Sequence, residues 1–242
     1  PEPFSPRASL GEGFTPEVDA PEWDARMTLE AVSPTASFKD RGATTTVARA
    51  LDLGVERIVD DSSGNAGAAF ATYAARAGLD AEIYVPASVK AAKLRAIEAA
   101  GATPVRVEGG RRAVTEACVE AVETGDSWYA SHAWCPAFLA GTATWAYEVA
   151  ARRDWQVPDA AVLPLGHGTL FLGAHRGFRT LREAGWTDRV PRLYGAQAAG
   201  TAPIVAAVHG DEAAAGDNDA ADGIQIAEPV RRAEILSAIA ST

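Results

Sequence analysis

Cysteine, lysine and long apolar runs are all scarce in this sequence of 242 residues, and each shortage excludes a class of protein. The two cysteines, Cys118 and Cys135, are too few for a disulfide framework, which favours a cytoplasmic protein in a reducing compartment. Apolar stretches are broken by Arg, Asp or Gly well before the roughly 18 residues that indicate a membrane span. No basic segment followed by an apolar one opens the chain, so we expect neither a membrane span nor a secretory signal.

Positive charge is also in short supply. The net charge is −10 and the pI is near 4.9, so bulk charge does not favour nucleic acid as a partner. Only three of the 22 basic residues are lysines, Lys39, Lys90 and Lys93, so each lysine that is present carries more information than usual. Hydrophobic residues make up 48% of the chain, which is enough to pack one large domain or two small ones.

The cysteines and histidines do not form the pattern of a metal site. His132 and Cys135 are three residues apart, but no second pair follows at the spacing of a zinc site. Cys118 shares an apolar stripe with Val114 and Val122, which favours a thiol in the core. We therefore expect no bound metal.

The order of predicted elements indicates the α/β class. Short apolar runs predict strands at 57–60, 81–85, 103–107, 127–130, 160–165 and 192–196. Helical patterns begin with caps at Ser37 and Ser88 and after turns elsewhere, and predict helices at 37–53, 68–77, 88–101, 111–123, 138–152 and from the loop 166–169 to 184. This alternation predicts open, mostly parallel sheets with helices on both faces. Residues 1–35 lack clean periodicity, and 211–222 has the composition of a loop or linker.

Lys39 occupies an unusual place in its predicted helix. If Ser37 is the N-cap, Lys39 lies in the first turn, where the helix dipole disfavours a cation and favours the neutral, nucleophilic amine. The dipole supplies at most about 2 kcal/mol, whereas lowering a lysine pKa to near 7 or 8 takes roughly 4 kcal/mol. Burial or a covalent Schiff base must supply the rest. The alternative is an exposed lysine at a helix start.

Two glycine-rich turns follow predicted strands. Segment 62–67 (Ser-Ser-Gly-Asn-Ala-Gly) and segment 166–169 (Gly-His-Gly-Thr) each lead into a predicted helix. Backbone N–H groups at such turns form a seat for a carboxylate or phosphate, and in open parallel sheets ligands bind at this edge. The alternative is an ordinary turn. Neither matches a nucleotide loop, because no Gly-Lys-Ser/Thr run is present and Phe171 stands where the third glycine of a dinucleotide motif belongs.

Taken together, the motifs resemble those of threonine synthases, members of the fold type II pyridoxal-phosphate-dependent enzymes with the tryptophan synthase β-like fold. The match covers about residues 9–236. Lys39 lies in the segment that resembles the cofactor-lysine motif of these enzymes, in which Ala36 replaces the usual glycine. The matching segments, in the family's order, are 11–16, 34–43, 62–67, 86–102, 138–148, 164–170 and 223–229.

The resemblance implies a role for each matched residue. Lys39 would be the catalytic residue, forming the internal aldimine with pyridoxal 5'-phosphate (PLP) and later moving protons. Phe38 would lie beside the cofactor ring, and Asn65 would donate a hydrogen bond to the ring hydroxyl. The loop that holds the substrate carboxylate would comprise Ser62, Ser63, Gly64, Asn65 and Ala66. The cofactor phosphate would be bound by Gly166, His167, Gly168 and Thr169.

The resemblance also implies a two-domain architecture and a reaction. A smaller α/β domain would span 30–137, and 1–29 with 138–242 would form a larger PLP-binding domain, incomplete because family members continue beyond the point that matches Ile239. The implied reaction converts O-phosphohomoserine to threonine with release of phosphate. The alternatives are a threonine or serine dehydratase, a cysteine synthase-like enzyme, and a non-catalytic relative. An amino acid is the expected small-molecule partner, and a homodimer is expected by analogy with relatives.

Overall fold

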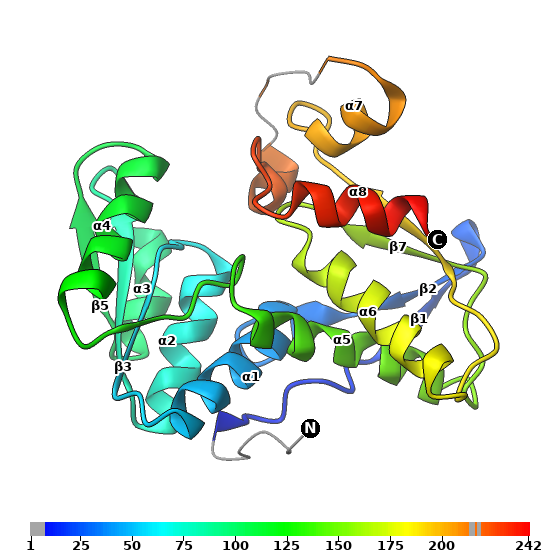
Figure 1. Cartoon of the computed structure of the whole chain (residues 1–242), viewed down its shortest axis with the longest axis horizontal. Coiled ribbons are helices and arrows are strands. Elements are labelled where there is room, and N and C mark those ends of the chain that lie inside the picture. The colour runs from blue at the N-terminus through cyan, green and yellow to red at the C-terminus, as the bar shows by residue number, and fades with distance from the viewer. Residues whose placement is uncertain (1–7, 213–215, 217–218) are drawn as a thin grey trace. The chain divides into compact units, whose positions relative to one another are not determined.

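The computed structural model describes residues 8–212, 216 and 219–242, and Figure 1 shows its helices and strands. The chain divides into two compact units, Pro1–Gly141 and Thr142–Thr242. We describe each unit by itself. The predicted division into 30–137 and 1–29 with 138–242 stays a prediction.

A four-stranded parallel sheet forms the centre of the first unit. Its strand order is β5-β4-β3-β6, and all neighbouring pairs are parallel. The strands are β3 (Arg57–Asp60), β4 (Asp80–Pro86), β5 (Thr103–Val107) and β6 (Trp128–Tyr129). The helices of this unit are α1 (Lys39–Asp52), α2 (Asn65–Ala77), α3 (Ala91–Ala99) and α4 (Arg111–Thr124). The predicted α/β class with a parallel sheet is confirmed.

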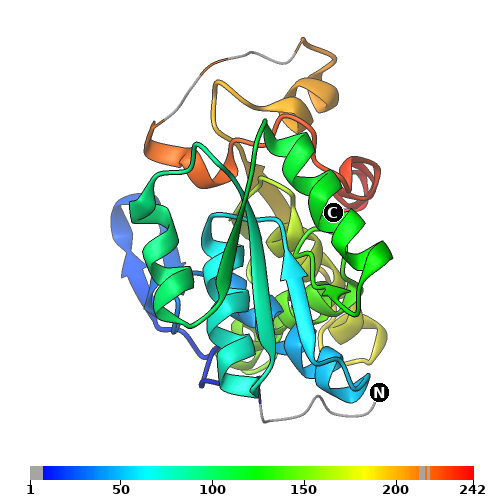
Figure 2. The same ribbon diagram turned by 90° about the vertical axis from the view of Figure 1, so that its left-hand side faces the viewer.

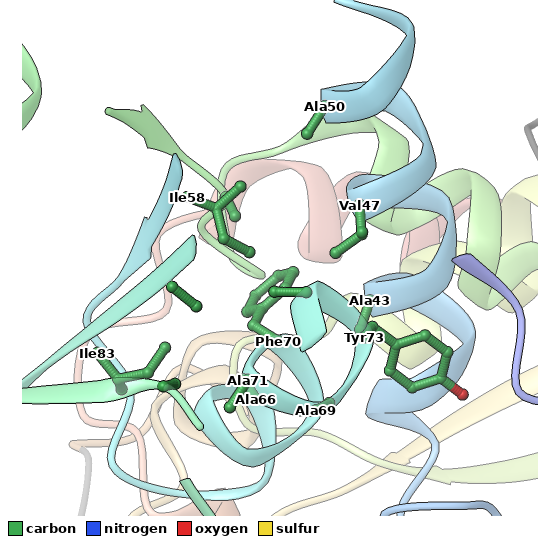
Figure 3. Close-up of a cluster of buried hydrophobic side chains, with 14 of the residues drawn as sticks. Ala43, Val47, Ala50, Ile58, Ala66, Ala69, Phe70, Ala71, Tyr73 and Ile83 are labelled. Atoms are coloured by element: carbon green, nitrogen blue, oxygen red, sulfur yellow. The ribbon is translucent and has the colours of Figure 1, made fainter. Parts of the chain in front are cut away.

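Helices cover both faces of this sheet (Figure 2), with α4 on one side and α2 and α3 on the other. On the α4 side, Cys118 packs with Val59 and Tyr84, which confirms the predicted core thiol. On the other side, Ile58 and Ile83 face Phe70, and small residues let α1 lie close to α2 (Figure 3). Burial of these apolar side chains is the main source of stability for the unit.

A hairpin precedes this sheet in a region where the sequence showed no periodicity. Strands β1 (Glu17–Ala20) and β2 (Ala25–Thr28) pair antiparallel, with the short 3₁₀ turn Pro21–Trp23 between them. Mostly exposed side chains give neither strand the alternating pattern that sequence reading depends on. A second 3₁₀ turn, Glu30–Val32, leads toward α1.

The second unit contains the parallel strands β7 (Ala160–Pro164) and β8 (Arg192–Ala196), which are connected through α6 (Thr169–Glu183). Helix α5 (Pro136–Ala151) runs across the boundary between the units, and its later part packs on α6, where Trp145 meets Phe178 edge-on. Helices α7 (Pro203–His209) and α8 (Arg232–Ala240) had no sequence prediction. The 3₁₀ segment η4 (Asp219–Ile224) includes residues 219–222, which were predicted as part of a loop or linker. None of the described helices is both long and apolar enough to cross a membrane. The predicted loop 211–222 lies partly outside the described residues.

Four predicted helix starts were wrong. Helix α5 begins at Pro136, two residues before the predicted start. Helix α1 has Phe38 as its N-cap rather than Ser37, although the Ser37 hydroxyl accepts a hydrogen bond from the Lys39 N–H at 3.3 Å. Helix α3 begins at Ala91, not at a Ser88 cap. Helix α2 begins at Asn65, three residues before the predicted start, so the second half of the predicted turn 62–67 is helical.

Candidate active site

Lys39 is the first residue of α1, so the prediction that it lies in the first helical turn is confirmed. Its Nζ lies 4.1 Å from the centroid of the Phe38 ring. Burial lowers the pKa of the amine from its ordinary value of 10.5 to about 8, and the negative charge of Asp60 opposes this effect. Burial therefore supplies the part of the pKa decrease that the helix dipole alone cannot supply. As a result, a fraction of the Lys39 amine is neutral near neutral pH.

The lowered pKa of Lys39 predicts a pH-dependent gain of stability when this lysine is removed. Between pH 8 and 10.5 the unfolded chain binds more protons than the folded chain, so stability rises with pH across this window. Below the window the cost of burying the amine is fully present. Lys39→Met is expected to raise the free energy of unfolding of the cofactor-free chain by roughly 3 kcal/mol at pH 7 and by roughly 1 kcal/mol at pH 10. Urea denaturation at both pH values measures this gain in stability. The control is Lys90→Met, because Lys90 is exposed. An equal gain for Lys39→Met at both pH values would contradict the lowered pKa.

Close packing fixes the helix that carries Lys39. A Cβ atom on Gly141 would overlap the carbonyl oxygen of Arg41, and one on Gly42 would overlap the ring of Phe138. The Thr45 hydroxyl donates a hydrogen bond to the Ala137 carbonyl at 2.8 Å. Helix α1 is thus held against the first residues of α5 at a distance that only glycine allows.

A buried ionic network fixes the same helix from another direction, and sequence reasoning missed it. Arg41 is 1% exposed, and its guanidinium donates two hydrogen bonds to the Glu30 carboxylate, both at 2.8 Å. The Thr15 hydroxyl, also buried, donates to Glu30 at 2.7 Å and accepts from Arg41 at 3.1 Å. In the same motif, Glu12 accepts a hydrogen bond from the Tyr73 hydroxyl of α2 at 2.9 Å. The motif 11–16 therefore anchors both α1 and α2, and the resemblance was its only sequence signal.

The loop between β3 and α2 has a defined local geometry. The Ser62 N–H donates to the Asp60 carboxylate at 3.1 Å, and the Gly64 N–H donates to the Ser62 hydroxyl at 3.3 Å. A Cβ atom on Gly67 would overlap the Ser62 carbonyl oxygen, so only glycine lets the helix start beneath this loop. Ser62 and Ser63 are half-buried, Gly64 and Asn65 are exposed, and Ala66 is buried. The loop leads into the N-terminus of a 13-residue helix, whose first N–H groups lack intrahelical partners and suit an anion.

Two buried aspartates stand at the carboxyl end of β3, and sequence reasoning did not single them out. Asp61 forms an ion pair with Arg111 at 2.7 Å and accepts a hydrogen bond from the Thr115 hydroxyl at 2.6 Å. Burial alone would raise the pKa of Asp61, but Arg111, Thr115 and neighbouring groups together lower it. Asp60 lies 3.8 Å from the Nδ1 atom of His132, and both side chains are buried. Two adjacent acids at the end of an apolar strand were the available signal.

In the second unit, the loop 166–169 leads into α6. Gly168 has a φ of 78°, a left-handed conformation that favours glycine, and a Cβ there would lie 2.5 Å from Ile235 of α8. Thr169 is the first residue of α6, and among the described residues its buried hydroxyl has no hydrogen-bond partner. His167 is half-buried. Gly166 lies against Ile224 and Ile226, which come from the matched segment 223–229.

Each unit, taken by itself, offers a group with a defined chemistry. The first unit offers an amine that burial keeps partly neutral, which is the form that attacks an aldehyde. The second offers a glycine turn, the N-terminus of a 15-residue helix and the unsatisfied hydroxyl of Thr169, which together suit a phosphate. An unsatisfied buried hydroxyl is costly, so a ligand oxygen there would recover a lost hydrogen bond.

Comparison with known protein families shows which family this chain belongs to. A family model described as pyridoxal-phosphate dependent enzyme matches residues 8–241. The chain belongs to this family. Its members depend on pyridoxal phosphate, and the match includes Lys39 and both glycine turns.

Curated relatives narrow the resemblance within the family. The chain is 34% identical over 215 residues to a threonine synthase of Methanosarcina acetivorans, covering 87% of this chain and 53% of the relative. It is 30% identical over 204 residues to a threonine synthase of Mycobacterium tuberculosis, covering 81% of this chain and 56% of the relative. The chain thus spans about half the length of the curated relatives it matches.

Solved structures of other members share the fold. A PLP-dependent aspartate racemase matches with a TM-score of 0.75 and 24% identity, covering 92% of this chain and 70% of that chain. The processed form of a tomato (Solanum lycopersicum) threonine deaminase matches with a TM-score of 0.74 and 21% identity, covering 88% and 59%. The tryptophan synthase β-like fold implied by the motifs is confirmed.

Proposed function

We propose that this chain carries out PLP-dependent chemistry on an amino acid, and that the reaction is the conversion of O-phosphohomoserine to threonine with release of phosphate. The observation that carries the proposal is the position of Lys39, whose side chain is half-buried at the first residue of α1 and whose pKa is lowered by burial to about 8. A lysine placed there costs stability, so a chemical use is the better explanation. The similarity to threonine synthases supports this choice of reaction.

The proposal assigns a role to each cofactor-binding residue that the motifs indicate. Lys39 would attach PLP, Phe38 would lie beside its ring, and Asn65 would donate a hydrogen bond to the ring hydroxyl. Its phosphate would be bound by Gly166, His167, Gly168 and Thr169. Bound PLP supplies an electron sink for bond cleavage at the amino acid. The Nζ of Lys39, once released by the incoming amino acid, would move protons at the substrate carbons.

The loop after β3 is the proposed seat for the substrate. Backbone N–H groups at the start of α2 and the hydroxyls of the loop would hold the substrate carboxylate, which fits a helix N-terminus in both charge and geometry. The residues assigned to this role are Ser62, Ser63, Gly64, Asn65 and Ala66. A cytoplasmic location and a homodimer stay predictions.

A substrate comparison tests the proposed reaction. The PLP-loaded chain is incubated separately with O-phosphohomoserine, threonine, serine and O-acetylserine with sulfide. The proposal predicts threonine and inorganic phosphate from the first substrate and no comparable turnover of the others, with Lys39→Ala as the inactive control. A 2-oxo acid and ammonia from threonine or serine would indicate the dehydratase alternative, and cysteine from O-acetylserine would indicate the synthase alternative. No turnover of any substrate would indicate the non-catalytic relative.

Thr169→Val tests the phosphate seat. Since the hydroxyl has no partner among the described residues, its removal is expected to leave the thermal stability of the cofactor-free chain unchanged or slightly higher. The affinity for PLP is expected to fall about tenfold, because a hydrogen bond to a charged oxygen is lost. Equilibrium dialysis and thermal melts measure the two effects. The control is Thr180→Val, an exposed position on the same helix, and equal affinity for the two variants would refute the assignment.

A further inference from the structure

Arg111 reaches from the start of α4 to the residue that precedes the proposed substrate loop, residues 62–66. Its guanidinium donates one hydrogen bond to the backbone carbonyl of Asp61 and another to the Asp61 carboxylate, the latter at 2.7 Å. Asp61 is buried, and its carboxylate also accepts a hydrogen bond from the Thr115 hydroxyl at 2.6 Å. Two side chains of α4 therefore hold the residue that follows β3.

The first peptide of the substrate loop is fixed at both of its ends. A peptide unit is planar, so the Asp61 carbonyl oxygen and the Ser62 N–H turn together. Arg111 donates to the oxygen, and the Asp60 carboxylate accepts a hydrogen bond from the Ser62 N–H at 3.1 Å. This peptide cannot rotate unless at least one of the two bonds breaks, so the bonds set the direction in which the loop leaves β3.

The other end of the loop is fixed by packing. A Cβ atom on Gly67 would overlap the Ser62 carbonyl oxygen, so the first turn of α2 lies directly against the loop. Helices α2 and α4 cover opposite faces of the sheet (Figure 2). The loop is therefore held from both faces, by packing against α2 and by the hydrogen bonds from α4.

The position of Arg111 in its helix is unfavourable by itself. Arg111 and Arg112 occupy the first turn of α4, which contains no acidic residue, and the helix dipole disfavours cations there. Arg112 forms an exposed ion pair with Glu116 of the same helix. Arg111 instead contacts Asp61, where the fixed fork of a guanidinium can donate to a carbonyl and a carboxylate at once.

We propose that Arg111 is a positioning residue that fixes the substrate loop and thereby sets the affinity of the chain for the carboxylate of an amino acid. The inference rests on the proposed function in taking this loop as the carboxylate seat. A helix N-terminus binds an anion best when its N–H groups already point at the ligand, because ordering them on binding costs affinity. Acting through Asp61, Arg111 supplies this order in advance, so its loss weakens substrate binding more than it slows the chemical step.

Hydrogen exchange in the full, cofactor-free chain tests the positioning by itself. Arg111→Met is expected to speed exchange of the Ser62 and Gly64 N–H groups about tenfold and to leave residues 70–74 of α2 unchanged. The matched control is Arg112→Met, which removes the adjacent exposed arginine and is expected to change neither region. Arg111→Lys keeps the charge but loses the forked geometry, so an intermediate rate is expected.

Steady-state kinetics of the PLP-loaded chain test the consequence for the substrate. With the amino acid that the substrate comparison identifies, Arg111→Met is expected to raise KM about tenfold and to change kcat less than about threefold. Arg111→Lys is expected to recover part of the loss in KM. Arg112→Met is expected to match the unchanged chain in both constants.

Several results would overturn the inference. These are unchanged exchange at Ser62 and Gly64 in a folded Arg111→Met chain, faster exchange that extends equally over α2, an equal effect of Arg112→Met, and a fall in kcat with KM unchanged. If Arg111→Met does not fold, Arg111→Lys decides by the same criteria. Failure of the proposed function is a separate result, because it would appear as no turnover by the unchanged chain while the change in exchange persists in the cofactor-free variant.

Discussion

Lys39→Ala is expected to reduce turnover of the preferred amino acid about 10³-fold or more, because it removes both the attachment point for PLP and the group that moves protons. The variant is expected to fold, because burying the protonated Lys39 amine costs stability and the substitution removes that cost. Phosphate release and threonine formation by the PLP-loaded variant measure the loss.

The matched control for this experiment is Lys90→Ala, an exposed lysine that lies outside both glycine turns. It is expected to retain the activity of the unchanged chain. Equal turnover by Lys39→Ala and the unchanged chain would remove the chemical explanation for this lysine.

Arg41→Met is expected to lower the free energy of unfolding by about 3–5 kcal/mol, because it leaves the Glu30 carboxylate without its partner in a buried network. Urea denaturation followed by tryptophan fluorescence measures the loss. Arg112→Met removes an exposed ion pair on α4 and is expected to leave the unfolding midpoint unchanged.

A double variant separates lost charge pairing from general disruption. Arg41→Met with Glu30→Leu removes both charges, and it is expected to recover most of the stability lost by Arg41→Met alone. A double variant that is less stable than Arg41→Met would contradict the view that the unpaired Glu30 is the source of the cost.

The first and last residues of several strands could be predicted, because the signals that set them lie in the adjacent sequence. Strands β3, β5 and β8 begin and end where the sequence predicts, because each is a short run that is bounded on both sides by turn or helix signals. The starts of α1, α2 and α3 could not be predicted as well. Helix α2 starts early because Gly67 lets its first turn lie beneath the Ser62 carbonyl, which is a tertiary contact that no capping rule describes.

The residues of the candidate site also fall into two groups, those that adjacent sequence indicates and those that only the folded chain brings together. Lys39 and the two glycine turns lie in contiguous segments, so helix position and composition were enough to single them out. His132 and Asp60 are more than 70 residues apart in the sequence and meet only because β6 pairs with β3 in the sheet. Glu30 and Thr15 likewise became visible as partners of Arg41 only in the folded chain.

Reduction of the PLP-loaded chain with borohydride, followed by peptide mapping, tests the central claim most directly. The account predicts one stable phosphopyridoxyl group, attached to the Nζ of Lys39, and its absence from Lys39→Ala. Attachment at Lys90, Lys93 or the amino terminus in place of Lys39, or no attachment at saturating PLP, would contradict it.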